Sequence, residues 1–158
     1  MNKSIMQVKE AMNKKVVIAF PETKITEIAR LMAKYGIGSV IIVNKIRSIV
    51  GIVTERDVMN VVAKMEDPRK LRASDIMSTG VITIDESRTI KEAAEIMIQN
   101  KIKKLPVVKK KEIRGIITAT DVMIANAELS KRIRPLMESK GPDKGLVEKD
   151  FVYLNIVG

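Results

Sequence analysis

Two copies of a Thr-x-x-Asp motif are the residues of this chain best suited to bind a ligand. Thr54 and Asp57 form the first copy, and Thr118 and Asp121 form the second. Each copy follows a short apolar run, so we expect each Asp at the junction between a strand and a helix. A carboxylate and a hydroxyl can hydrogen-bond a polar ligand there, although the same residues could simply cap the helix. Two equivalent carboxylates predict two binding sites.

The chain lacks the residues that carry out most enzyme chemistry. It contains no His and no Cys, which removes the commonest general base and any thiolate nucleophile or metal ligand. It also lacks a Gly-x-x-x-x-Gly-Lys phosphate loop. Because the two Asp residues are placed for separate sites, they do not form one acid/base pair. We therefore expect neither an enzyme, nor a metal site, nor a cofactor.

The net charge of +10 allows two interpretations. One is a solvated, highly charged surface of the kind found in heat-stable proteins. The other is attraction to nucleotide phosphates or to nucleic acid, although an aromatic content of 3% leaves few side chains for base stacking. No apolar run could span a bilayer, and the N-terminus lacks the apolar core of a signal peptide, so we expect a cytoplasmic protein without membrane contact.

An internal repeat organises the chain. The helical pattern of Ile25, Ala29 and Met32 recurs 65 residues later as Ile90, Ala94 and Met97. A repeat of this length indicates two copies of one structural unit. Neither copy, of about 60 residues, could bury a large core alone, so the two should pack directly on each other.

Each copy is predicted to fold as strand, helix, strand, strand, helix. In the first copy we expect strands at 16–18, 40–43 and 49–53, a helix between Thr23 and Gly36, and a helix from Asp57. In the second copy the strands are expected at 81–84, 105–108 and 113–117, with helices starting at Ser87 or Thr89 and at Asp121. The predicted fold is an α/β protein of two pseudo-symmetric β-α-β-β-α repeats, 5–65 and 72–125, packed sheet to sheet. Residues 126–158 should form a helix, a connector and a β-prone tail at 151–157 that must be buried or paired.

These motifs resemble a known family. The Ala- and Met-bearing helix, the run Leu105-Pro106-Val107-Val108 and the Gly-Ile-Ile-Thr-x-x-Asp motif are similar to a tandem cystathionine-β-synthase (CBS) domain pair, or Bateman module. The resemblance covers roughly residues 5–125. It implies a stand-alone regulatory or sensor module that binds an adenosine-containing ligand in clefts between the repeats. The ligand would be AMP, ADP, ATP or a compound of the S-adenosylmethionine type, and a CBS pair that binds nucleic acid through its basic surface is the alternative.

The resemblance also implies roles for particular residues. Asp57 and Asp121 would each accept from the two vicinal hydroxyls of a ribose, with Thr54 and Thr118 beside them. The adenine would lie on the residues that lead into the first two strands of each copy, namely Lys15, Val16, Val17, Gly38, Ser39 and Val40 in the first and Thr79, Gly80, Val81, Ile82, Leu105 and Pro106 in the second. The apolar members of this set could equally be core residues.

Phosphate would be bound by Arg56 in the first site and by Lys103 and Lys104 in the second. Because Thr120 replaces Arg56 and Pro106 replaces Ile41, the two sites should differ in affinity or ligand.

Partners are expected as well. Members of the family commonly pair through their repeat helices, and the helices here carry more apolar residues than one small core needs. We therefore expect a homodimer and an unidentified regulated protein, with packing inside one chain as the alternative use of these apolar residues.

Overall fold

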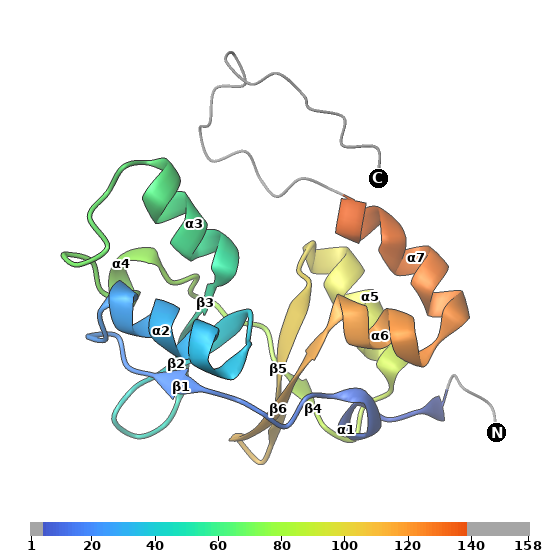
Figure 1. The fold of residues 1–158 in the computed structure, drawn as a ribbon. Helices are drawn as coiled ribbons and strands as arrows, with labels where there is room; N and C mark the ends of the chain where they lie inside the picture. Colours follow the sequence, from blue (N-terminus) through green and yellow to red (C-terminus); the bar gives the residue numbers. More distant parts are fainter. Residues whose placement is uncertain (1–4, 139–158) are drawn as a thin grey trace, which may run out of the picture.

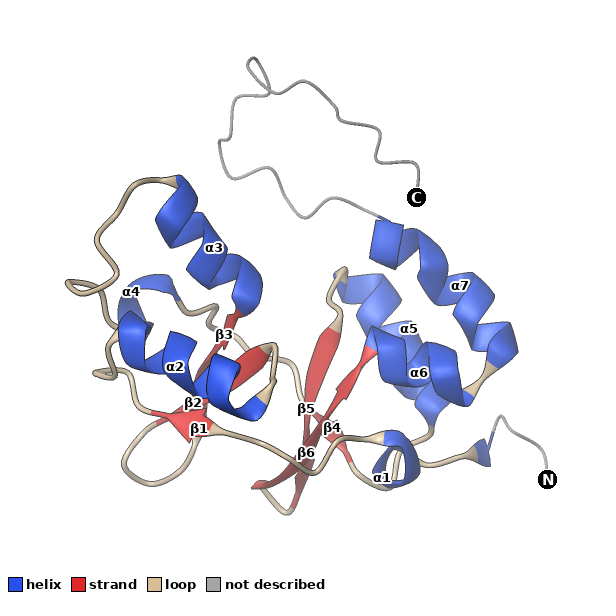
Figure 2. Ribbon diagram, in the orientation of Figure 1, coloured by secondary structure: helices blue, strands red, loops and turns tan. Residues whose placement is uncertain are grey.

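The two copies of the repeat form two halves of one molecule. The computed structural model describes residues 5–138, so the predicted connector and the β-prone tail at 151–157 lie outside the described residues. Each half has a three-stranded sheet, and the helices lie on the outer sides of the two sheets (Figures 1 and 2). No helix within residues 5–138 is long and apolar enough to cross a membrane.

The elements follow the predicted order. The first half contains β1 (Ile18–Ala19), α2 (Ile25–Tyr35), β2 (Ser39–Val43), β3 (Ile49–Thr54) and α3 (Glu55–Ala63). The second contains β4 (Ile84–Asp85), α5 (Ile90–Asn100), β5 (Lys104–Lys109), β6 (Glu112–Thr118) and α6 (Ala119–Ala125), followed by α7 (Ala127–Glu138). In both sheets the first strand runs parallel to the middle strand and the last runs antiparallel to it. The predicted β-α-β-β-α fold is confirmed.

The middle strands show why the sheets face each other. Side chains alternate along a strand, so Val40 and Ile42 point into the hydrophobic core that the first sheet shares with its helices. Ile41, between them, lies outside this core yet is 1% exposed. Its counterpart Pro106 is also buried outside the core of its own half. The two sheets therefore bury these residues against each other.

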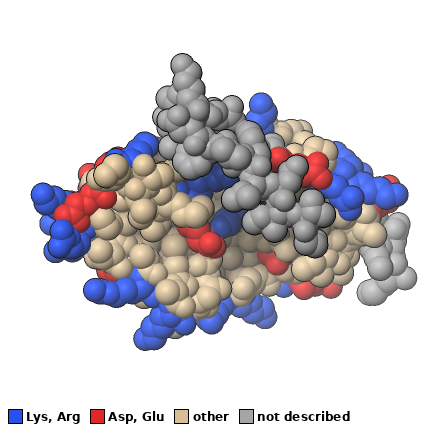
Figure 3. Space-filling view, turned by 45° about the horizontal axis from the view of Figure 1, so that its top comes forward, with Lys and Arg blue, Asp and Glu red and all other residues tan. Residues whose placement is uncertain are grey.

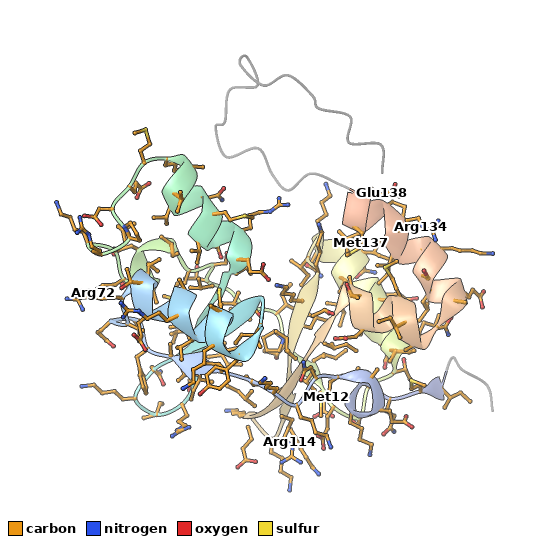
Figure 4. The ribbon with its side chains drawn as sticks, in the orientation of Figure 1. Met12, Arg72, Arg114, Arg134, Met137 and Glu138 are labelled. Atoms are coloured by element: carbon orange, nitrogen blue, oxygen red, sulfur yellow. The ribbon has the colours of Figure 1, made fainter. Side chains whose placement is uncertain are left out.

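Two short helices, α1 (Val8–Ala11) and α4 (Ala73–Ile76), are exchanged between the halves. Helix α1 lies at the start of the first copy, but Val8 is fully buried in the core of the second half. Helix α4 lies at the start of the second copy, but Ala73 is fully buried in the core of the first half. Arg72, labelled in Figure 4, thus lies in the first half, where its side chain donates to the Glu22 carbonyl at 2.9 Å.

The exchange explains the glycine that precedes each Thr-x-x-Asp motif. A Cβ at Gly115 would lie 2.7 Å from the Asn13 carbonyl oxygen and 2.8 Å from Met12 Sδ (Figure 4). A Cβ at Gly51 would collide with the Met77 side chain. These glycines therefore make room for the segment that crosses from the other half.

The exchange also shortens the first strands. Asn13 pairs with Ile116 of the second sheet, and Ser78 pairs with Ile52 of the first. Because the residues before each first strand pair with the sheet of the other half, this strand starts later than predicted. Strand β1 begins at Ile18 rather than at residue 16, and β4 begins at Ile84 rather than at residue 81.

Helix starts differ from the prediction by one or two residues. Lys24 rather than Thr23 is the N-cap residue of α2, because the Thr23 hydroxyl accepts from the Phe20 N–H at 3.1 Å. Helix α3 begins at Glu55, two residues before the predicted Asp57. Gly36 ends α2 in the left-handed region at φ 60°, as predicted.

We predict that Gly115→Ala destabilises the protein more than Gly51→Ala. The new methyl group at residue 115 would meet a backbone carbonyl, whereas at residue 51 it would meet the flexible Met77 side chain. Overpacking of this kind raises the free energy of the folded state by about 1–3 kcal/mol. Chemical denaturation of both variants measures the difference, and equal losses would contradict the close backbone approach at Gly115.

Candidate functional site

The first Thr-x-x-Asp motif forms the junction between β3 and α3. Thr54 is the N-cap residue, and its hydroxyl oxygen accepts from the Asp57 N–H at 3.4 Å. In return Asp57 Oδ2 accepts from the Thr54 N–H at 2.8 Å and from the Thr54 hydroxyl at 3.1 Å. This reciprocal arrangement is a capping box, which satisfies amide groups that the first helical turn leaves unpaired.

The second motif repeats this geometry between β6 and α6. Asp121 Oδ2 accepts from the Thr118 N–H at 2.8 Å and from the Thr118 hydroxyl at 2.9 Å. Capping is thus one role of both motifs. Within residues 5–138, Oδ1 of Asp57 and Oδ1 of Asp121 accept no hydrogen bond, and both side chains are half-buried. One oxygen of each carboxylate is therefore available to a ligand.

A capping box by itself does not identify a ligand site. The same box starts α5, where Glu92 Oε2 accepts from the Thr89 N–H at 2.8 Å. What distinguishes the two Thr-x-x-Asp junctions is their position beside the entry to the middle strand of each sheet.

The strand entries are hydrogen-bonded to the helix starts. The Gly38 carbonyl accepts from the Glu55 N–H at 3.1 Å, and the Lys103 carbonyl accepts from the Ala119 N–H at 2.8 Å. In the ladders, Ser39 pairs with Thr54, and Lys104 pairs with Thr118. The structure thus brings Gly38 and Ser39, two expected adenine residues, next to the expected ribose residues of the first site.

The side chain of Lys104 contacts the half of the molecule in which it was not expected. We assigned its side chain to the phosphate group of the second site, but its Nζ donates to the Gly38 carbonyl of the first half at 2.9 Å. Burial lowers the pKa of Lys104, and the nearby carboxylates of Glu55 and Asp57 partly offset this effect. The Lys104 side chain therefore reaches from the second half to the first, and its ammonium group lies near Asp57. Lys103 stays half-buried in the second half, and Arg56 is exposed on α3.

The remaining expected adenine residues differ in how far they are buried. The side chains of Val40 and Leu105 are fully buried in the two cores, so the core interpretation holds for them. Pro106 is buried between the sheets, and Val17 and Ile82 pack against the cores. Val16 and Val81 are half-buried, and Thr79 and Gly80 are exposed. Lys15 is exposed, and its Nζ donates to the Tyr35 carbonyl at 3.0 Å, near the end of α2.

Two cavities lie close to these elements. One of about 170 Å³ lies between α3 and α4 and is lined by Asp57, Asn60 and Asp75 among others. This is smaller than the pockets of about 300–1,000 Å³ that usually hold small molecules. The other, of about 400 Å³, lies along β4 and α5 and does not include Asp121. A ligand as large as a nucleoside would therefore require space beyond the smaller cavity.

Sequence reasoning missed Glu55. The residue stands inside the first Thr-x-x-Asp motif where the second motif has Ala119, so comparing the two copies could have identified it. The contact between Lys104 and Gly38 joins residues from different copies and had no comparable signal.

Comparison with known proteins identifies the family. The family model described as the CBS domain matches this chain twice, at residues 8–64 and 73–128. A protein of Methanopyrus kandleri, MK0525, is 38% identical over 120 residues, which cover 75% of this chain and 61% of that protein. The inosine-5′-monophosphate dehydrogenase of Aquifex aeolicus is 38% identical over 65% of this chain and 21% of its own length. This chain therefore spans less than two thirds of these curated relatives.

Solved structures agree with this assignment. The CBS domain pair of protein MJ0100, in complex with 5′-methylthioadenosine and S-adenosyl-L-methionine, is 29% identical with a TM-score of 0.69, covering 76% of this chain and 94% of that one. A hexameric CBS protein from bloom-forming cyanobacteria is 25% identical with a TM-score of 0.72, covering 80% and 74%. Both family-model matches and both structures point the same way: the chain belongs to the CBS domain family, and it is a tandem CBS domain pair.

Proposed function

We propose that this CBS domain pair is a regulatory module that binds adenosine-containing ligands between its two halves. The observation that carries the proposal is the available Oδ1 atom of Asp57 and of Asp121, held in the same geometry at the same end of each sheet. The ligands named for the MJ0100 domain pair, 5′-methylthioadenosine and S-adenosyl-L-methionine, both contain a ribose and an adenine. This supports the same class of ligand here, with AMP, ADP and ATP as further candidates.

The chemistry of the junction suits a ribose. The vicinal hydroxyls are donors, and each Asp has an acceptor oxygen whose position the capping box fixes. Binding would then need little reordering of the carboxylate, which reduces the entropic cost of association. The exposed Thr79 and Gly80 and the strand-entry backbone at Gly38 and Ser39 would supply the edge of the adenine site.

Regulation of another protein is part of the proposal. Inosine-5′-monophosphate dehydrogenase is an enzyme that matches this chain over 21% of its length, so most of that enzyme lies outside the matched region. A CBS pair of this kind would change the activity of a separate protein when it binds its ligand.

A second candidate is binding of nucleic acid through the basic surface. On the face shown in Figure 3, Lys and Arg side chains lie at several places around the outline and near the centre, with acidic residues among them. This favours the solvated surface over a nucleic-acid groove. Binding to nucleic acid that falls steeply with salt and is indifferent to adenosine ligands would favour the alternative.

We also propose a homodimer that forms through α3. Helix α7 contributes Leu129, Ile133 and Leu136 to the core of the second half, so it covers α5 and α6. Among the described residues, no equivalent helix covers the first half. The side chains of Met59 and Val62 are 62% and 66% exposed there. A second copy packed on this apolar face of α3 would remove it from water.

Asp57→Ala and Asp121→Ala should each weaken ligand binding at one site. A hydrogen bond to a charged group contributes about 1.5–3 kcal/mol, so the affinity of the affected site should fall roughly tenfold or more. Calorimetric titration with AMP and with 5′-methylthioadenosine measures the change. Each substitution also removes a capping interaction and should lower the unfolding free energy by about 1 kcal/mol.

Glu92→Ala is the matched control for the capping effect. It removes a box of the same geometry at α5, together with an ion pair to Arg88, so it should lower stability at least as much and leave ligand affinity unchanged. If the Asp variants bind every ligand of the panel as tightly as the wild type, these residues only cap helices and the proposed site is wrong.

Met59→Glu combined with Val62→Glu should convert the homodimer to a monomer. Each substitution places a carboxylate in an interface that would exclude water, which disfavours association strongly. Analytical ultracentrifugation at micromolar concentration measures the mass. Ile46→Glu, at a residue that is 81% exposed in the hairpin between β2 and β3, should leave the dimer intact. A monomeric wild type would refute the dimer.

A further inference from the structure

We infer that Glu55 makes the first site selective for adenosine ligands whose 5′ substituent carries no net negative charge. This inference rests on the proposed function, and it assigns the two sites different ligand classes. It concerns a residue that none of the expected ribose, adenine or phosphate roles includes.

The geometry around Gly38 carries the inference. A Cβ built on Gly38 would collide with Glu55 Oε1 and lie 3.1 Å from Lys104 Nζ. The Glu55 carboxylate and the Lys104 ammonium group therefore rest together against the bare backbone of Gly38. A ligand that lies along this strand entry meets both charges at once.

The ammonium group of Lys104 is already engaged at this place. Lys104 Nζ donates to the Gly38 carbonyl at 2.9 Å, and Glu55 and Asp57 both act on it electrostatically. A phosphate group would have to compete with these two carboxylates for the ammonium group. A thioether would meet no such repulsion, and a sulfonium or amino group would be attracted to Glu55.

The second half lacks each part of this arrangement. Lys103 stands where the first half has Gly38, and Ala119 stands where it has Glu55, because both pairs share the same carbonyl-to-amide hydrogen bond. Ser39 is the first-half counterpart of Lys104, as its pairing with Thr54 matches the pairing of Lys104 with Thr118. The second site therefore has no carboxylate at the first helical residue, and a phosphate is not repelled there.

One substitution in two backgrounds tests the inference. The two sites are separated by working in Asp121→Ala, which retains the first site, and in Asp57→Ala, which retains the second. In the first background, Glu55→Ala should tighten ATP binding about fivefold or more at low salt and leave 5′-methylthioadenosine binding within twofold. In the second background, the same substitution should change neither affinity by more than twofold, because the second site has Ala119 in place of Glu55.

Calorimetric titration with these two ligands gives the readout. Glu112→Ala, which removes an exposed carboxylate in the hairpin between β5 and β6, is the control for net charge and should change neither affinity by more than twofold. Unchanged ATP affinity of Glu55→Ala in the first background, with 5′-methylthioadenosine still bound, would overturn the selectivity and leave the proposed function intact. Wild-type protein that binds neither ligand would overturn both.

Discussion

Neither half of this molecule completes its hydrophobic core with its own sequence copy. The second core includes Val8 from the start of the first copy, and the first core includes Ala73 from the start of the second copy. This reciprocal exchange holds the two sheets face to face and buries Ile41 and Pro106 between them. It also explains Gly51 and Gly115, because a larger residue at either position would strike the crossing segment. The glycine before each motif is thus a packing requirement, and the proposed ligand contacts come from the Thr and Asp residues.

The Thr-x-x-Asp motif combines a structural role with the proposed binding role. Its capping box fixes one carboxylate oxygen of each Asp and leaves the other without a partner among residues 5–138. The capping box of Thr89 and Glu92 shows that such a cap also forms at a helix that does not start beside the entry to a middle strand. Position therefore separates the candidate sites from an ordinary helix start. The two sites also differ in their charged side chains. Lys104 of the second copy contacts Gly38 of the first, whereas the equivalent residue of the first copy is Ser39, which has no charge.

The repeat in the sequence was sufficient to predict the order of the elements within each copy, and the motifs that it repeats indicated the family. Apolar periodicity located α2 and α5, and Gly36 marked the end of α2, because these signals are local. The exchanged helices were not predicted, since contacts such as Val8 with the second core join distant residues. For the same reason the starts of β1 and β4 were placed too early. At the site, both motifs lie at strand-to-helix junctions as predicted, whereas the contact of the Lys104 side chain with Gly38 of the first half was not expected and Glu55 was not considered.

The proposed function depends on recognition of the vicinal hydroxyls of a ribose by Asp57 and Asp121. Calorimetric titration of the wild-type protein with adenosine, 2′-deoxyadenosine and 3′-deoxyadenosine measures this recognition. Each deoxy compound lacks one donor to the carboxylate, and loss of a hydrogen bond to a charged group weakens binding by about 1.5–3 kcal/mol. Both deoxy compounds should therefore bind roughly tenfold more weakly than adenosine, or more weakly still. Equal affinity for all three would contradict ribose recognition by these two residues.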